Sequence, residues 1–391
     1  MNFPIWLPAL LGFLTAVGPM STDMYLPAFP AIEAALGGQA GAAQITLATW
    51  FAGLAIGQIT QGTLSDRYGR RAPLIFGTAL YALASAGCAL SPDLPTLSAF
   101  RFLSAIGGSA GMVIPRAIVR DLADGQAAAR LMSRLMLVMG VAPILAPTLG
   151  GFVLRVGDWH TIFWICAGYG AVCCAVVMAV LPDTLPQQRR VKLGFGGLVA
   201  RYLGIIRERG FITHALMGGF AMFGMFAFLG GSPPVFIEMF HLSPATYGAL
   251  FGCSAAGYIT GTQINPRLLP RFGTGRVMRV AVRVFLLSAS VLTVVAFTGW
   301  GGWVAVAVPI FFCMGSQGFT MPNATVGALS RHAGHAASAS ALMGTLQFCL
   351  GAVSGVVVGL ASDGTARPMA LLMLTGAAGA VIADLCRPNR A

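Results

Sequence analysis

Hydrophobic residues occur along the chain in long runs separated by short polar segments. About 20 mainly apolar residues are enough for a helix to cross the hydrocarbon core of a bilayer. Runs of this length predict two groups of six membrane-spanning helices. The first group covers 5–31, 43–64, 73–91, 95–118, 131–154 and 160–181, and the second covers 211–232, 246–266, 277–298, 302–324, 337–361 and 367–386.

A longer polar segment, 182–210, separates the two groups and carries six basic residues. We expect it to be a linker with a short surface helix. The pattern therefore predicts an all-α membrane protein of 12 transmembrane helices, with an N-terminal six-helix bundle over 1–181 and a C-terminal six-helix bundle over 211–391.

Composition supports a lipid environment. Hydrophobic residues make up 57% of the chain and charged residues only 9%, whereas soluble domains carry roughly 25% charged residues. The net charge of +12 would suggest a nucleic-acid partner, but the arginines lie in short clusters between apolar runs. We therefore expect membrane lipid around the chain and no nucleic acid. The N-terminus lacks a basic segment and a cleavage site, so the first run should remain as a helix.

Basic residues also predict the orientation, because cytoplasmic loops are enriched in Lys and Arg. With the N-terminus inside, all 24 Lys and Arg residues except Arg101, Arg155 and Arg367 fall on the cytoplasmic side. An omitted helix would invert every later loop and destroy this asymmetry. We expect an even number of spans, with both termini and the linker in the cytoplasm.

A short internal repeat supports two related halves. Leu64-Ser-Asp-Arg-Tyr-Gly69 follows the second run, and Leu268-Leu-Pro-Arg-Phe-Gly273 follows the eighth, at an offset of 204 residues. Such a parallel repeat predicts two six-helix halves related by an axis along the membrane normal.

Five motifs lie in order along the first half. Gly62–Arg71 resembles the signature loop between helices two and three of the major facilitator superfamily. Arg101 with Leu103–Gly111 resembles its fourth-helix motif, Gly140–Gly151 the fifth-helix motif of its antiporters, and Leu181–Leu185 the element that ends its sixth helix. Ser21–Pro30 is similar to the first helix of the bicyclomycin-resistance (Bcr/CflA) subfamily of drug–proton antiporters.

The resemblance implies a monomeric transporter in the bacterial inner membrane that exports small apolar or amphipathic molecules in exchange for protons. It implies no cofactor beyond the proton as coupling ion. A proton-coupled exporter or importer of one metabolite, such as an amino acid, dipeptide or organic acid, stays open as an alternative. An importer of polar solutes should carry more polar groups in its spans.

Charged residues at the predicted cytoplasmic surface suggest a conformational switch. Asp66, Arg67, Arg70 and Arg71, with Gly62 and Gly69 in the same loop, should lie beside Asp121 at the end of helix four. Opposite charges there can latch the two halves together, weakly, since exposed pairs contribute about 0–1 kcal/mol each. The alternative is that these arginines only set the topology.

The fifth run is rich in Gly and Pro, which favour close packing and a bend. We expect a bent helix at the interface of the halves, although ordinary packing of small residues would give the same pattern. The residues concerned are Gly140, Pro143, Pro147, Gly150 and Gly151.

Asp23 and Arg101 are charged residues inside predicted spans. A charge near the bilayer centre costs several kcal/mol and usually has a function. We expect Asp23 to bind the coupling proton. Arg101, which is always charged, should be a fixed partner that releases or captures Asp23 as the halves rock. A purely structural ion pair is one alternative, and a solvated Asp23 near the periplasmic end is another. Asp384, followed by two arginines, is interpreted as a solvated interfacial acid.

The substrate cavity should be apolar. Helix seven contains a Met- and Phe-rich stripe over 220–228, which suits varied ligands but is also typical of a lipid-facing or core surface. Polar groups in the spans could orient a substrate or simply bond a neighbouring helix. The candidate cavity residues are Tyr25, Met139, Phe223, Phe226, Gln317, Asn323 and Gln347.

Two other classes of protein are excluded. An ATP-driven pump needs a Gly-Lys-Ser/Thr phosphate loop, and the single lysine, Lys192, follows Val191. A membrane enzyme needs a nucleophile and a base, and the five histidines form no such pattern. No group of residues has the spacing of metal ligands.

Overall fold

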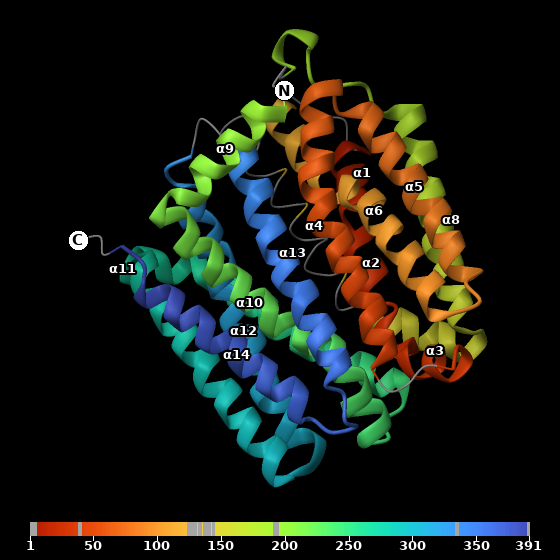
Figure 1. Ribbon diagram of the computed structural model, residues 1–391, viewed down its shortest axis with the longest axis vertical. Helices are drawn as coiled ribbons and strands as arrows, with labels where there is room; N and C mark the ends of the chain where they lie inside the picture. Colours follow the sequence, from red (N-terminus) through yellow and green to blue (C-terminus); the bar gives the residue numbers. More distant parts are fainter. Residues whose placement is uncertain are drawn as a thin grey trace.

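The structure is a computed structural model that describes residues 6–37, 41–122, 131, 135, 142, 145–190, 195–332 and 336–388. Within these residues every regular element is a helix. Figure 1 shows the helices of the first half on one side of the molecule and those of the second half on the other. The expected all-α architecture is therefore confirmed.

The first half begins with a broken helix and continues with long ones. Its elements are α1 (Trp6–Thr15), α2 (Val17–Thr22), the 3-10 turn η1 (Leu26–Ala28), α3 (Phe29–Ala35), α4 (Ala42–Tyr68), α5 (Arg71–Ala89), α6 (Leu94–Leu122), a short helix over Leu145–Val156 and α8 (Trp159–Val180).

The linker and the second half follow. Their elements are η2 (Gln187–Arg189), α9 (Phe195–Arg207), α10 (Arg209–Pro233), the π-helical turn η3 (Pro234–Met239), α11 (Pro244–Thr298), α12 (Gly302–Leu329), α13 (Ala336–Leu360) and α14 (Arg367–Leu385). The short helix expected in the linker is α9.

Nine helices of the described chain are long and apolar enough to cross a membrane. One of them, α11, has 55 residues and covers two predicted runs. The first predicted run corresponds to α1–α3, and the fifth, 131–154, is described mainly over the helix Leu145–Val156. Each of the twelve predicted spans thus has a helical counterpart.

The first span is not the single helix that the hydrophobic run suggested. It is interrupted around Asp23, where α2 ends and η1 begins. Pro27 and Pro30 lie in the first turns of η1 and α3. Proline lacks an amide hydrogen and is tolerated in the first turn but not in a helix interior. The chain therefore restarts after each break, which leaves Asp23 at an irregular point.

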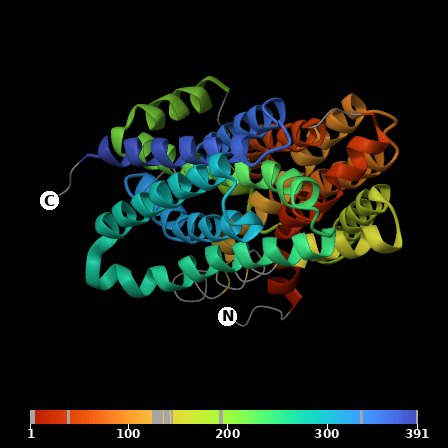
Figure 2. The same ribbon diagram turned by 90° about the horizontal axis from the view of Figure 1, so that it is seen from below.

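The long helix α11 turns back on itself at Gly273, which has a non-helical φ of 72° and ψ of 153°. Figure 2 shows the two arms of this bend. Gly69, which ends α4, has a φ of 93° and a ψ of 173°. The two glycines of the sequence repeat therefore have similar backbone conformations, which only glycine adopts readily.

The two halves meet along α4 and α13, which lie side by side at the centre of Figure 1. Phe51 of α4 stacks on Phe226 of α10 with 3.6 Å between ring centroids. At the end distant from the linker, η1 and α3 also contact α10, α11 and η3. The boundaries of the two bundles at residues 181 and 211 remain a prediction.

Candidate functional site

A cavity of about 220 Å³ lies between the two halves. Residues of the first span, α4 and α6 line it from one side, and α10, α11, α12 and α13 from the other. Flexible Met and Phe side chains dominate its walls, so the cavity suits apolar ligands of varied shape. These residues are Met112, Met222, Met225, Met314, Met321, Phe51, Phe226, Phe228, Phe251 and Phe348.

Asp23 is the one charged residue among the described residues that line this cavity. Its side chain is almost fully buried, at 5% exposure. The Thr22 hydroxyl donates a hydrogen bond to Asp23 Oδ1 at 3.0 Å, and the Asp23 amide donates to the Pro19 carbonyl at 2.8 Å. The break in the first span thus places a carboxyl group in an apolar chamber.

Arg101 contacts residues of the first span and is also buried, at 2% exposure. Its Cζ is 4.5 Å from the ring centroid of Tyr25 and 4.7 Å from that of Trp50, and Nη1 donates to the Ser21 carbonyl at 2.8 Å. The faces of aromatic rings attract a guanidinium group, by about 2 kcal/mol when desolvated. The planar group therefore has a cage of rings in place of a counter-ion.

Asp23 and Arg101 do not form the expected ion pair in this conformation. No ion pair of the described residues includes either side chain. Two Arg101 atoms, Nε and Nη2, have no hydrogen-bond acceptor among the residues that the structure describes. The predicted exchange between the two residues remains a hypothesis.

Of the predicted cavity residues, only Phe226 is among the described lining residues. Tyr25 packs on Arg101 and its hydroxyl contacts Thr46. Asn323 instead bonds a neighbouring helix, because its Nδ2 donates to Asn265 Oδ1 at 2.7 Å.

Three further cavity candidates are buried but do not line the chamber. Phe223, Gln317 and Gln347 are at most 8% exposed. Neither polar atom of the Gln317 amide has a hydrogen-bond partner in the described part of the chain. Met139 lies outside the described residues. Some residues of the Met- and Phe-rich stripe of α10 therefore line the cavity, and others are packed in the protein core.

The end of the fifth predicted span packs closely against both halves. A Cβ at Gly150 would overlap the Met24 carbonyl, and one at Gly151 would lie 2.9 Å from the Pro244 carbonyl at the start of α11. The Pro147 carbonyl is 3.1 Å from the Cβ position of Gly248. These glycines permit the close approach expected at the interface. Gly140 and Pro143 lie outside the described residues.

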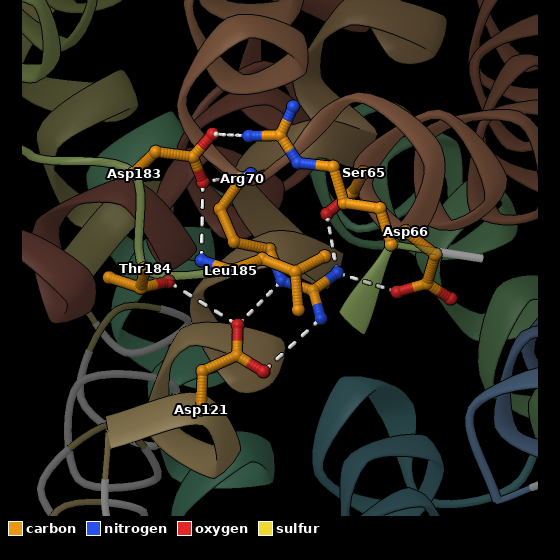
Figure 3. Close-up of polar contacts among 8 residues, drawn as sticks. Ser65, Asp66, Arg70, Asp121, Asp183, Thr184 and Leu185 are labelled. Carbon is orange, nitrogen blue, oxygen red and sulfur yellow. Dashed lines mark hydrogen bonds and ion pairs between the residues drawn. The ribbon is translucent and has the colours of Figure 1, made fainter. Parts of the chain in front are cut away.

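Arg70 is the centre of a polar cluster at the linker end of the first half (Figure 3). Its Nε donates to Asp121 Oδ2 at 2.7 Å, and its Nη1 donates to Asp66 Oδ1 at 2.6 Å and to Ser65 Oγ at 2.9 Å. The Arg70 side chain is only 7% exposed. Charge-assisted bonds in such a buried setting are stronger than surface pairs.

Asp183 also belongs to this cluster. The motif 181–185 contains it, but we did not predict it from the sequence as a site residue. Asp183 Oδ1 accepts bonds from the Arg70 amide at 2.9 Å and the Leu185 amide at 3.2 Å, and Oδ2 accepts from Arg190 Nη2 at 2.8 Å. The sequence did contain a signal for this role, because Asp183 is an acidic residue directly after a hydrophobic run, at the same predicted membrane surface as the basic loop. Asp183 connects the start of the linker to the loop after α4.

The structure brings Asp66, Arg70 and Asp121 together as expected, whereas a latch between the two halves stays a prediction. Asp66, Arg70, Asp121 and Asp183 all belong to the first half or the start of the linker. The cluster therefore fixes the ends of α4, α5, α6 and α8 relative to one another.

The remaining loop residues have smaller roles. Arg67 is exposed and its Cζ lies 5.5 Å from the Tyr68 ring centroid. Arg71 Nη2 donates to the Met178 carbonyl at 2.6 Å. A Cβ at Gly62 would have only an ordinary contact, at 3.9 Å from Val113 Cγ1.

Gly69→Ala is expected to destabilise the protein. Its positive φ disfavours any L side chain, and a Cβ there would overlap the Asp183 carboxylate. Strain of this kind costs of order 1–3 kcal/mol. Gly62→Ala is the matched control, and a thermal unfolding scan in detergent compares the two. Equal melting temperatures for the two variants would contradict the role assigned to Gly69.

Asp384 is not the solvated acid that the sequence suggested. Its side chain is 5% exposed, and its Oδ1 lies 2.9 Å from Arg387 Nη2. Arg279 Nε is a second cation, 3.9 Å from Oδ2. The acid therefore joins the end of α14 to the second arm of α11.

The chain is similar in sequence and in fold to several known proteins. The family model described as Major Facilitator Superfamily matches residues 11–356. An uncharacterized MFS-type transporter, YdgK of Bacillus subtilis, is 35% identical over 94% of this chain and 92% of its own. A bicyclomycin resistance protein homolog of Haemophilus influenzae is 28% identical over 93% of this chain and 91% of its own.

Among solved structures, a D-xylose-proton symporter superposes with a TM-score of 0.73 at 16% identity, covering 97% of this chain and 95% of the symporter. The resemblance seen in the motifs is thus confirmed by whole-chain similarity. Its relatives are transporters and not enzymes. The chain is a multi-pass membrane protein that belongs to the Major Facilitator Superfamily.

Proposed function

We propose that the protein exports small apolar or amphipathic molecules, drugs among them, in exchange for protons, with Asp23 as the proton-binding group. The observation that carries this proposal is the carboxyl group of Asp23, the single acid among the described residues that line the mainly apolar chamber between the halves. A proton on Asp23 removes the one charge from that chamber. The similarity to a bicyclomycin resistance protein homolog favours a drug-like substrate.

Exchange requires that the cavity open to one side at a time. The halves approach closely at the end distant from the linker, where a Cβ at Gly151 would lie 2.9 Å from the Pro244 carbonyl and one at Gly248 would lie 3.1 Å from the Pro147 carbonyl. We infer that this end is the closed periplasmic gate and that the Arg70 cluster moves as one unit when the halves rock. The chain would act as a monomer, because each half supplies walls to the same cavity.

Orientation follows from the same proposal, with both termini and α9 in the cytoplasm of the bacterial inner membrane. A cysteine at Ala200, on α9, should react with a membrane-impermeant maleimide only in inverted vesicles, in a background without native cysteines. A cysteine at Arg155 should react only in intact cells. Reversal of this pattern would reject the orientation.

A transport assay tests the function itself. The purified chain in liposomes with an imposed pH gradient should release protons when an apolar cationic or neutral compound from a drug panel is added. Amino acids, dipeptides and organic acids are the comparison set, because they represent a metabolite transporter. A response to one of these alone, with none to the drug panel, would replace drug export by metabolite transport.

A further inference from the structure

A second groove lies on the outer surface of the second half and shares no lining residue with the central cavity. It has a volume of about 460 Å³ and lies between the two arms of α11 and the helix α12. Its walls are apolar and include Phe272, Val280, Val284, Phe311 and Phe312. All five side chains are at least 38% exposed. In a membrane protein such a surface faces acyl chains rather than water.

One charged residue, Arg276, lines this otherwise apolar groove. It follows the bend at Gly273 and lies on the second arm of α11 with Arg279 and Arg283, at spacings of three and seven residues. Residues at these spacings share one side of a helix. Arg276 is therefore the member of an exposed row of three arginines that reaches the groove.

Two of these arginines, Arg276 and Arg283, have no acidic partner among the described residues, whereas Arg279 lies beside Asp384. Glu238, Asp363 and Asp384 are the acids that follow Gly210 in the sequence. Glu238 and Asp363 follow α10 and α13 at the opposite end, and Asp384 already lies beside Arg387 and Arg279. No ion pair of the described chain includes Arg276 or Arg283. The rim of the groove is thus open to an external anion.

We propose that this groove binds an anionic phospholipid, with an acyl chain between the arms of α11 and α12 and the phosphate beside Arg276. The occupant must combine a long apolar part with a negative headgroup, since the site pairs apolar walls with an unneutralised cation at the membrane surface. Basic pockets between membrane-spanning helices are suited to anionic lipid headgroups. The site is separate from the transport cavity, and its occupancy does not depend on what the protein exports.

Native mass spectrometry of the purified, delipidated full chain tests the proposal. The probes are phosphatidylglycerol and phosphatidylcholine with identical acyl chains. The native protein should retain its first phosphatidylglycerol more strongly than its first phosphatidylcholine. Arg276→Gln should weaken phosphatidylglycerol binding about fivefold, the factor that corresponds to roughly 1 kcal/mol per basic residue, and leave phosphatidylcholine binding unchanged.

Two further variants separate the groove from the charge. Val280→Trp fills the groove from an exposed position and should weaken binding of both lipids. Val291→Trp, exposed on the same arm but away from the groove, and Arg155→Gln, an exposed arginine after the fifth span, should leave both unchanged. Equal binding of the two lipids by the native protein, or undiminished phosphatidylglycerol binding in Arg276→Gln, would overturn the proposal.

Discussion

Asp23→Asn should abolish proton-driven uphill export while substrate binding persists. The amide keeps the shape of the carboxyl group and its contact with Thr22, but it cannot gain and lose a proton. Asp23 is also the single charge that the described residues present to the cavity, so no neighbouring acid there can replace it. We expect accumulation in inverted vesicles to fall to the level of vesicles without a gradient, with downhill exchange retained.

The control for this variant is Asp93→Asn, which alters an exposed acid that accepts a bond from the Thr96 amide at the start of α6. Asparagine caps a helix about as well as aspartate, so uphill export should be unchanged. Correctly folded Asp23→Asn protein that still concentrates both a cationic and a neutral substrate would reject the coupling role. The next acid to test would be Asp384, whose neighbours are arginines.

Arg70→Gln should be the most damaging change outside the cavity. It removes the shared partner of Asp66 and Asp121 and leaves two carboxylates close together, one of them only 14% exposed. Removing one member of a fully buried pair costs 3–5 kcal/mol. We expect about 3 kcal/mol here because Asp66 is one third exposed. The melting temperature in detergent and the turnover rate in liposomes should both fall, while substrate affinity changes little.

The neighbouring arginine is a matched control. Arg67→Gln removes the same charge from the same loop, but Arg67 is exposed and lies over the Tyr68 ring. Its stability should change by less than about 1 kcal/mol. Asp66→Asn should lie between the two variants. If Arg67→Gln and Arg70→Gln were equally impaired, net charge rather than the buried cluster would explain the effect.

The sequence by itself determined the number and position of the membrane-spanning helices. Each span depends on the composition of about 20 consecutive residues. A break such as that at Asp23 is indicated by prolines a few residues away. The importance of Asp23 and Arg101 could be inferred in the same way, because the cost of a charge inside an apolar run requires no knowledge of its neighbours.

Only the tertiary structure decided which residues meet. Arg70 bonds to Asp121 and Asp183, which are 51 and 113 residues away in the sequence. Arg101 contacts aromatic rings, although the sequence suggested an acidic partner. Phe226 faces the cavity while Phe223, one turn earlier, does not. These outcomes depend on the rotation and crossing of each helix. Packing between distant segments sets both, and the hydropathy of a single segment contains no information about them.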